Sequence, residues 1–471
     1  MAKLQIRNIT KKSLIYSIGT LISSISTLLL IPMFSKYLEP ADYGNYELAY
    51  SLTFLIVTIS YFETHVTMLR FMYGIKNENN KTKKEAIYSS ALFRTLSTVL
   101  LVIIGYFTTK ITFFPYHRVS LFFGFCFTFG LFYLNCARGL DKEYDYTTAF
   151  SIFHITNLLS NFIFLVILKR NAESLFISLS ISYLTQIIYL ESKLKIISSF
   201  SRKYINFRLI PRMLRFSIPL AIAAVGTWVL QFYSNIRLVA LLGSDSNGLY
   251  TMALNFARSI PTLANGIIIA WEEIAFSVRG ETEDKNKFFA DTISKVIVTL
   301  SCIYMVFVPF VTLIIPYYLD SSYHNIVAVV VIATAGRTVD FFSLFLASIF
   351  GNKINSKPLM ISTTIGAVVD LLIINMMINN YGIVGAAISD CIGFVIVALI
   401  RFYWLKFENH YNIKFIKISI YILIAMIIGY LSIIFDTTQN LILVVVALII
   451  AAPNILPKTI EKVKETLKRD K

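Results

Sequence analysis

The chain has 471 residues, of which 56% are hydrophobic and only 15% are charged, and its mean hydropathy is +0.68. A soluble protein of this length needs more charge on its surface, so the composition excludes that class and predicts a polytopic membrane protein. The formal net charge of +16 would suit nucleic acid, but membrane proteins also gather basic residues in the loops on one side of the bilayer.

Apolar runs that cross about 30 Å of hydrocarbon need about 20 residues each. The sequence contains fourteen such runs, at residues 13–34, 45–66, 87–107, 119–137, 148–168, 174–190, 214–242, 249–270, 291–315, 326–350, 359–378, 382–403, 415–434 and 439–456. No small-residue cleavage site follows the first run, so we expect a retained helix rather than a signal peptide. The expected fold is an all-α membrane protein with about 14 transmembrane helices.

The basic residues alternate between the connections on the two sides. Most of the 43 Lys and Arg residues fall in the N-terminus, every second loop and the C-terminus. The opposite loops hold Lys36, Lys110, Arg118, Lys169 and Arg170. The positive-inside rule therefore places both termini in the cytoplasm and explains the net charge without nucleic acid. The runs at 81–84 and 202–203 are expected to contact anionic lipid head groups.

Residues 38–49 recur at 242–253, an offset of 204 positions. The matches are Leu38, Gly44, Tyr46 and Ala49 with Leu242, Gly248, Tyr250 and Ala253. Each stretch follows one apolar run and opens another, so we expect a tight hairpin with Gly at a positive φ and Tyr at the membrane interface. The repeat predicts two six-helix lobes related by an axis along the membrane normal, at 1–200 and 201–410. Residues 411–471 form two added helices and a basic cytoplasmic tail.

Ionisable residues deep in a span are functional candidates, because lipid makes charge expensive. At 1.5 Å per residue, Arg258, Arg337 and Asp370 lie near mid-membrane. The others are Arg237, Asp390, Asp340, Arg94 and Glu47. Pro219 and Pro261 are expected to bend the helices that carry Arg237 and Arg258.

Two interpretations of these charges remain open. The arginines could line a wet cavity and bind phosphate through forked hydrogen bonds, with the acids balancing them or carrying a coupling ion. Alternatively, they form internal ion pairs: Arg337 and Asp340 share a helix face, and Arg94 could extend to the cytoplasmic head groups. The four cysteines lie in apolar runs without metal-ligand spacing, and no nucleotide-binding loop is present. We therefore expect no metal, cofactor or catalytic residues.

Several short motifs resemble those of a known family. They are Tyr37-Leu38 with Tyr43-Gly44, Leu69-Arg70-Phe71, Ala137-Arg138-Gly139-Leu140-Asp141 followed by Tyr144 and Tyr146, Arg215-Phe216-Ser217-Ile218-Pro219, and Tyr381-Gly382 with Gly385-Ala386-Ala387. In order and spacing the chain resembles the Wzx-type polysaccharide flippases of bacterial inner membranes, within the multidrug/oligosaccharidyl-lipid/polysaccharide exporter superfamily. One departure is Asn235-Ile236-Arg237, where many relatives have Asp-Arg.

The resemblance implies an inverted-V transporter with a central cavity between its lobes. Its cargo would be undecaprenyl-pyrophosphate-linked oligosaccharide, an O-antigen or capsule repeat unit, carried to the outer leaflet and coupled to an ion gradient. The implied partners are the bilayer and polysaccharide polymerase or assembly proteins. The expected pyrophosphate ligands are Arg237, Arg258, Arg337 and Arg94, and the expected coupling residues are Asp370, Asp340, Asp390 and Glu47.

Two other functions compete with the flippase. A drug or cation antiporter of the same superfamily (MATE-type) should have an acidic cavity, whereas the mid-membrane arginines favour an anionic cargo. A membrane-embedded glycosyltransferase or polymerase generally has a sizeable outer loop, and every outer loop predicted here is short. The sequence names neither the glycan nor the coupling ion.

Overall fold

The computed structural model describes residues 2–73, 80–108, 114–261, 268, 271, 283–352, 357–409 and 415–469. Its elements in these ranges are helical, so the predicted all-α architecture is confirmed. The first part of the chain forms α1 (Ala2–Tyr37), α2 (Pro40–Tyr61), α3 (Thr64–Tyr73), α4 (Asn80–Thr108), α5 (His117–Gly139), α6 (Glu143–Asn161), η1 (Phe162–Ile167) and α7 (Glu173–Leu194).

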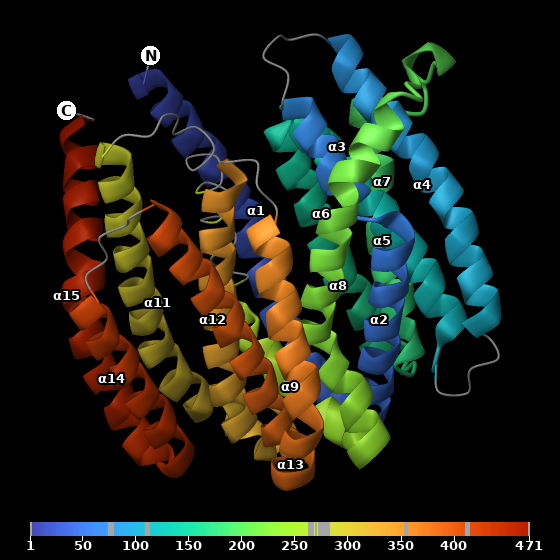
Figure 1. The fold of residues 1–471 in the computed structure, drawn as a ribbon. Coiled ribbons are helices and arrows are strands. Elements are labelled where there is room, and N and C mark those ends of the chain that lie inside the picture. The colour runs from blue at the N-terminus through green and yellow to red at the C-terminus, as the bar shows by residue number, and fades with distance from the viewer. Residues whose placement is uncertain are drawn as a thin grey trace.

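The second part begins after a short turn. It forms η2 (Arg202–Tyr204), α8 (Leu209–Leu242), α9 (Ser244–Ala257), α11 (Glu283–Tyr318), η3 (Ser321–Ile326), α12 (Val327–Asn352), α13 (Lys357–Asn409), α14 (Phe415–Ile434) and α15 (Thr437–Arg469). Both chain ends lie at the same end of the molecule (Figure 1), as an even number of crossings requires.

Among the described residues, ten helices are long and apolar enough to cross a membrane, and the bent pair α2–α3 makes one further span. Two more predicted spans are recovered because Gly382, with φ 59°, divides α13 into two limbs, and because α14 is a shorter apolar helix. The predicted span 249–270 begins as α9, and most of its second half lies outside the described residues. Each of the fourteen predicted runs therefore coincides with a helix, in whole or in part.

Packing divides the helices into two groups, and one helix, α8, contacts members of both. In the first group α6 packs on α1 and α7, and α5 on α7; in the second, α13 packs on α12 and α8, and α9 on α12. The helix α8 also contacts α2, α3 and α4, so its first half lies among the helices of the first group (Figure 1). Helices α14 and α15 pack on α11 at the edge of the molecule (Figure 1).

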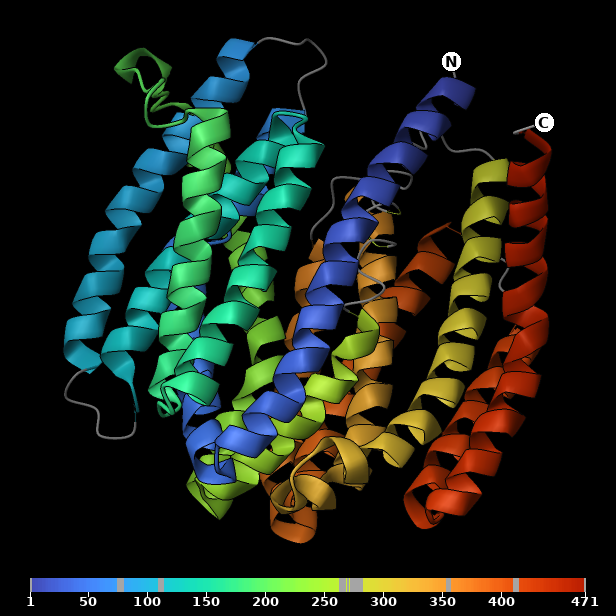
Figure 2. The ribbon, with the colours of Figure 1, turned by 180° about the vertical axis from the view of Figure 1, so that it is seen from behind.

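The two groups lie close together at the end opposite the termini and spread apart toward the termini, as both views show (Figures 1 and 2). The largest core cluster joins residues from both groups, including Tyr43 and Phe123 with Tyr250 and Tyr323. This junction of the two groups brings the candidate residues together.

Candidate functional site

The two copies of the sequence repeat meet each other in space. A Cβ atom on Gly44 of α2 would lie 2.0 Å from the carbonyl oxygen of Ser244, and one on Gly248 of α9 would lie 1.9 Å from that of Pro40. The two contacts are counterparts, because Pro40 and Ser244 are also 204 positions apart. We call this contact the hairpin crossing. The backbones approach so closely that only glycine fits at either position.

The roles predicted for Gly and Tyr in this motif are wrong. Gly44 and Gly248 lie within helices, and the residue with the left-handed turn is Gly243, with φ 90°. Tyr46 and Tyr250 are only 8% and 0% exposed, so they do not anchor at the membrane interface. Both pack inside the protein, where surrounding helices cover them.

Hydrogen bonds between the groups reinforce the hairpin crossing. Asn247 Nδ2 donates to the Gly44 carbonyl at 2.8 Å. Further along α2, Ser51 receives two donors from α8: Trp228 Nε1 binds its carbonyl and Asn235 Nδ2 binds its hydroxyl, each at 2.8 Å. Side-chain hydrogen bonds between membrane helices contribute about 0.6–2 kcal/mol each. Together with the close backbone contact, they close this end of the molecule.

A group of charges that we call the charged cluster lies at the same junction. Its members are Glu47, Arg258, Arg337, Asp340 and Asp390. Arg258 caps α9 at the interruption expected near Pro261, and it lies within electrostatic reach of Glu47, Arg337 and Asp390. Its guanidinium carbon lies 5.8 Å from the centre of the Phe232 ring. The cluster thus joins α2 to the charges of the second group.

Arg337 is the buried cation of the cluster. Its Nη1 lies 3.8 Å from Asp340 Oδ2, which confirms the expected pair, and its guanidinium stacks 5.1 Å from the Phe394 ring. Its Nη2 is buried and has no hydrogen-bond partner within the described ranges. A small cavity beside it is also lined by Tyr250 and Asp390. A buried donor with free capacity beside a cavity is suited to bind an anion oxygen.

The aspartates of α13 have different surroundings. Asp390 accepts hydrogen bonds from the hydroxyls of Ser234 and Tyr250 and lies near Arg337. Asp370 accepts one from the Ser389 hydroxyl, and its nearest described charge is Asp390. Its Oδ2 is buried without a partner among the described residues. Asp390 therefore belongs to the cluster, whereas Asp370 faces another carboxylate rather than an arginine.

Arg237 lies apart from the charged cluster. Its Nε donates to Asn375 Oδ1 at 2.7 Å, which joins α8 to the first limb of α13. The sequence analysis missed Arg401, which is buried, donates to Ser343 and Ser362, and lies within electrostatic reach of Asp340. The available signal was an arginine inside the last turn of the apolar run at 382–403.

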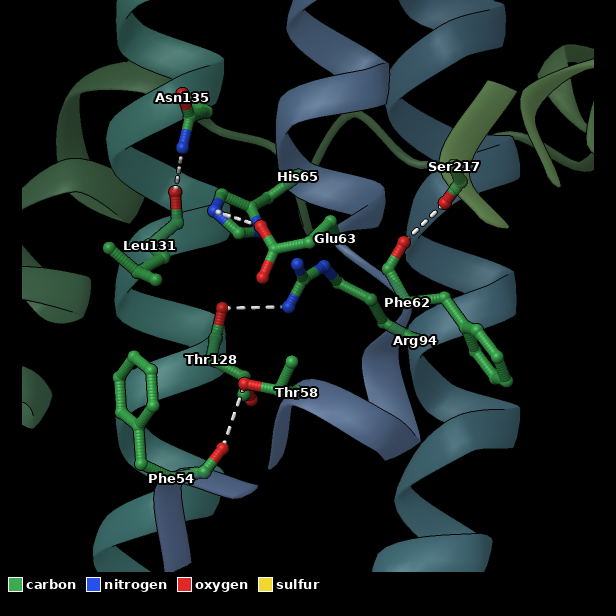
Figure 3. A network of polar contacts seen from close by, with 10 residues as sticks. All are labelled: Phe54, Thr58, Phe62, Glu63, His65, Arg94, Thr128, Leu131, Asn135 and Ser217. Atoms are coloured by element: carbon green, nitrogen blue, oxygen red, sulfur yellow. Dashed lines mark hydrogen bonds and ion pairs between the residues drawn. The ribbon is translucent and has the colours of Figure 1, made fainter. Parts of the chain in front are cut away.

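Arg94 also lies apart, inside the first group of helices. It is 1% exposed, and its Nη1 donates to the Thr128 carbonyl at 2.8 Å. Figure 3 shows Glu63 pointing toward the guanidinium, and His65 Nε2 lies 3.6 Å from Glu63 Oε2. Arg94 therefore does not extend to the head groups. It holds an internal charge network between α3, α4 and α5.

This network forms at a break between α2 and α3. The two helices meet at 49°, and Phe62 and Glu63 have φ values of 49° and 51°. The Phe62 carbonyl, which the break frees, accepts a hydrogen bond from Ser217 of α8 (Figure 3). The sequence analysis missed Glu63 and His65. Their only signal was a polar pair at the end of an apolar run.

The chemistry of these sites is electrostatic. Within the described part of the chain no group of three or more His, Cys, Asp or Glu side chains is placed to hold a metal ion. The charged cluster offers guanidinium donors for an anion and buried carboxylates for a proton or cation.

Comparison with known proteins identifies relatives for most of the chain. The model of the family described as "Polysaccharide biosynthesis protein" matches residues 9–271. An uncharacterized membrane protein of Methanocaldococcus jannaschii is 22% identical over 206 residues, which cover 44% of this chain. The match spans about half the length of that relative, 48%.

Solved structures share the fold at low identity. A lipid II flippase, MurJ, in an inward closed conformation superposes with a TM-score of 0.68 at 17% identity, covering 95% of this chain and all of that one. A multidrug resistance MATE family transporter of the MOP superfamily, in its inward-facing conformation, gives 0.66 at 15% identity, covering 84% of this chain and 98% of that one. The fold is therefore that of the superfamily to which the sequence motifs pointed.

Proposed function

Because this chain belongs to the polysaccharide biosynthesis protein family, we propose that it is a flippase for lipid-linked oligosaccharide. It moves the cargo from the cytoplasmic to the outer leaflet of a bacterial inner membrane, with both termini in the cytoplasm. The cargo class is undecaprenyl-pyrophosphate-linked oligosaccharide, such as an O-antigen or capsule repeat unit. Its partners are the bilayer and the polymerase or assembly proteins that receive the glycan.

The observation that carries the proposal is the pair of arginines at the junction of the two helix groups. Arg258 and Arg337 lie within electrostatic reach of each other, and Arg337 keeps a buried donor with no described partner. Nearby carboxylates balance these two charges in the absence of cargo, and the buried donor of Arg337 is left for an anion oxygen. Guanidinium groups bind phosphate oxygens with two parallel hydrogen bonds, so the chemistry of this pair suits a pyrophosphate.

The carboxylates are assigned to charge balance and coupling. Asp340 and Asp390 neutralise Arg337, and Glu47 lies opposite Arg258 on α2. Asp370 is left for a proton or cation, because its neighbour is another carboxylate. Binding of that ion would relieve repulsion between Asp370 and Asp390 and would link the gradient to the charged cluster.

A drug or cation antiporter is the second candidate. The fold similarity to multidrug transporters and the two buried aspartates, Asp370 and Asp390, favour it. The two candidates differ in the sign of the cargo's charge, because a cationic drug would be repelled by Arg258 and Arg337.

The deciding experiment reconstitutes the purified chain in vesicles. Polyprenyl-pyrophosphate-linked oligosaccharide with a fluorescent label on the sugar is placed in both leaflets, and an impermeant quencher reports how fast labelled lipid exchanges between them. Exchange should require the protein and should be blocked by unlabelled cargo. Efflux of cationic dyes without any exchange of the lipid-linked sugar would contradict the flippase and support the antiporter.

A further inference from the structure

The connection between α7 and α8 has an extreme charge composition. Residues 192–215, which include the last residues of α7 and the first two turns of α8, contain no Asp or Glu. They contain seven basic residues: Lys193, Lys195, Arg202, Lys203, Arg208, Arg212 and Arg215. The connection lies at the same end of the molecule as both termini, beside the start of α4 (Figure 1).

This connection is held firmly to the helix ends beneath it. The Glu191 carboxylate accepts hydrogen bonds from the backbone amides of Ile196 and Ile197 at 3.1 and 3.0 Å. The Tyr88 hydroxyl of α4 donates to the Ile196 carbonyl at 3.0 Å, and the Asn206 amide donates to Ser89 Oγ at 3.0 Å. The path of its backbone is therefore set by the fold.

Three large apolar side chains of this connection are more than half exposed. Ile197 is 71% exposed and Phe207 70%, and Phe200, whose ring centre lies 5.5 Å from that of Tyr88, is 53% exposed. Hydrogen bonds fix the backbone of the segment, yet most of the surface of these side chains is left uncovered. The basic side chains that alternate with them, among them Lys195 and Arg202, are exposed as well.

We propose that residues 195–208 are a docking surface for an anionic phospholipid bilayer, on the side of the membrane that carries both termini. Aromatic and aliphatic side chains enter the boundary between head groups and acyl chains, and the basic residues bind lipid phosphates around them. Each Lys or Arg near an anionic surface contributes about 1 kcal/mol. Contact with the lipid surface thereby adds to the hydrogen bonds that hold the connection between α7 and α8 in place.

The test uses the full chain in nanodiscs. A Phe200→Cys variant is labelled with a membrane-impermeant maleimide in phosphatidylcholine alone and in phosphatidylcholine with phosphatidylglycerol. Unmodified protein gives the background, since its cysteines are buried or partly buried. Lys142→Cys, in an exposed loop after α5, is the matched control. Phe200→Cys should label roughly tenfold more slowly with phosphatidylglycerol present, and Lys142→Cys should label equally fast in both.

Adding Arg202→Gln and Lys203→Gln to Phe200→Cys should speed its labelling in phosphatidylglycerol about tenfold or more, because two head-group contacts are lost. Equally fast labelling of Phe200→Cys in both lipids would overturn the proposal and leave the surface free for a soluble partner. Equal protection in detergent without phospholipid would also overturn it, since a second copy of the chain would then be the cover.

Discussion

Two arginines of the charged cluster differ in how deeply they are buried. Arg337 is buried, with Asp340 beside it and an aromatic ring against its face. Arg258 is half-buried at the end of α9, between Glu47 on one side and Arg337 on the other. The more accessible cation is the one that an incoming pyrophosphate would meet first, and the buried one would hold it at depth.

Replacing Arg258 with Ala removes charge-assisted hydrogen bonds to phosphate, which contribute about 1.5–3 kcal/mol each. Exchange of labelled lipid in the vesicle assay should therefore fall roughly 10- to 100-fold at normal protein levels. Arg258→Lys should be intermediate, because a point charge loses the bidentate geometry. Arg118→Ala, which removes an exposed charge in the first turn of α5, is the control. Full activity of Arg258→Ala would make this residue structural.

Asp370→Asn tests the coupling role. Asn keeps the shape of the side chain and can still bind Ser389, but it cannot hold a proton or balance a cation. Gradient-driven transport in vesicles should be lost, while binding of lipid-linked cargo should stay within about twofold. Asp340→Asn should instead change cargo affinity, since Asp340 balances Arg337. Unchanged gradient dependence in Asp370→Asn would rule out the carrier role.

At the scale of elements, the hairpin crossing is the feature with the strictest geometry. Segments of α2 and α9 cross with glycine at both contact points, and polar side chains add specific bonds around them. Van der Waals contact and hydrogen bonds drive helix association in lipid, where no hydrophobic force acts between apolar helices. A transporter that releases cargo at this end has to separate these helices.

Gly44→Ala should therefore favour separation of the crossing, and Gly248→Ala should do the same. Either Cβ would overlap a backbone oxygen, and such overpacking costs about 1–3 kcal/mol. The readout is disulfide formation in Asn45→Cys with Ser244→Cys, whose native side chains hydrogen-bond at 2.8 Å. The rate of disulfide formation should fall roughly tenfold. The control is Gly19→Ala, whose new Cβ atom would lie 3.2 Å from a side-chain carbon of Thr147. It should leave the rate of disulfide formation unchanged.

At the scale of the whole molecule, one arrangement of the helices places the termini, the basic connections and the open spread of the two groups at one end (Figures 1 and 2). The hairpin crossing lies at the other end. Because basic connections stay on the cytoplasmic side, we expect the crossing to face the outside.

This orientation predicts the accessibility of single cysteines. Asp245→Cys, at the exposed start of α9, should react with an impermeant reagent added to intact cells. Thr82→Cys, at the start of α4, should react only after the membrane is opened. The native cysteines, three buried and one half-buried, supply the background. The opposite pattern at both positions would invert the proposed topology.

The candidate site was only partly predictable. Arg337 with Asp340 followed from a spacing of three residues on one helix. The buried position of Arg94 could not be predicted, because it depends on how α3 and α5 pack around it. The helix break that brings Glu63 toward Arg94 also gave no signal in the sequence. Arg237 was expected to bind pyrophosphate together with Arg258 because both are arginines inside a span, although α8 places it beside Asn375.

The sequence by itself determined the helical class, the positions of the spans and the internal repeat. These depend on hydropathy and residue identity along the chain, and a bilayer imposes helix on any long apolar run. Only the tertiary structure decided what the repeat does. The glycines that resembled turn residues are contact points between α2 and α9, and the tyrosines are buried in the core. Such roles depend on which distant helices meet, and no local pattern specifies that packing.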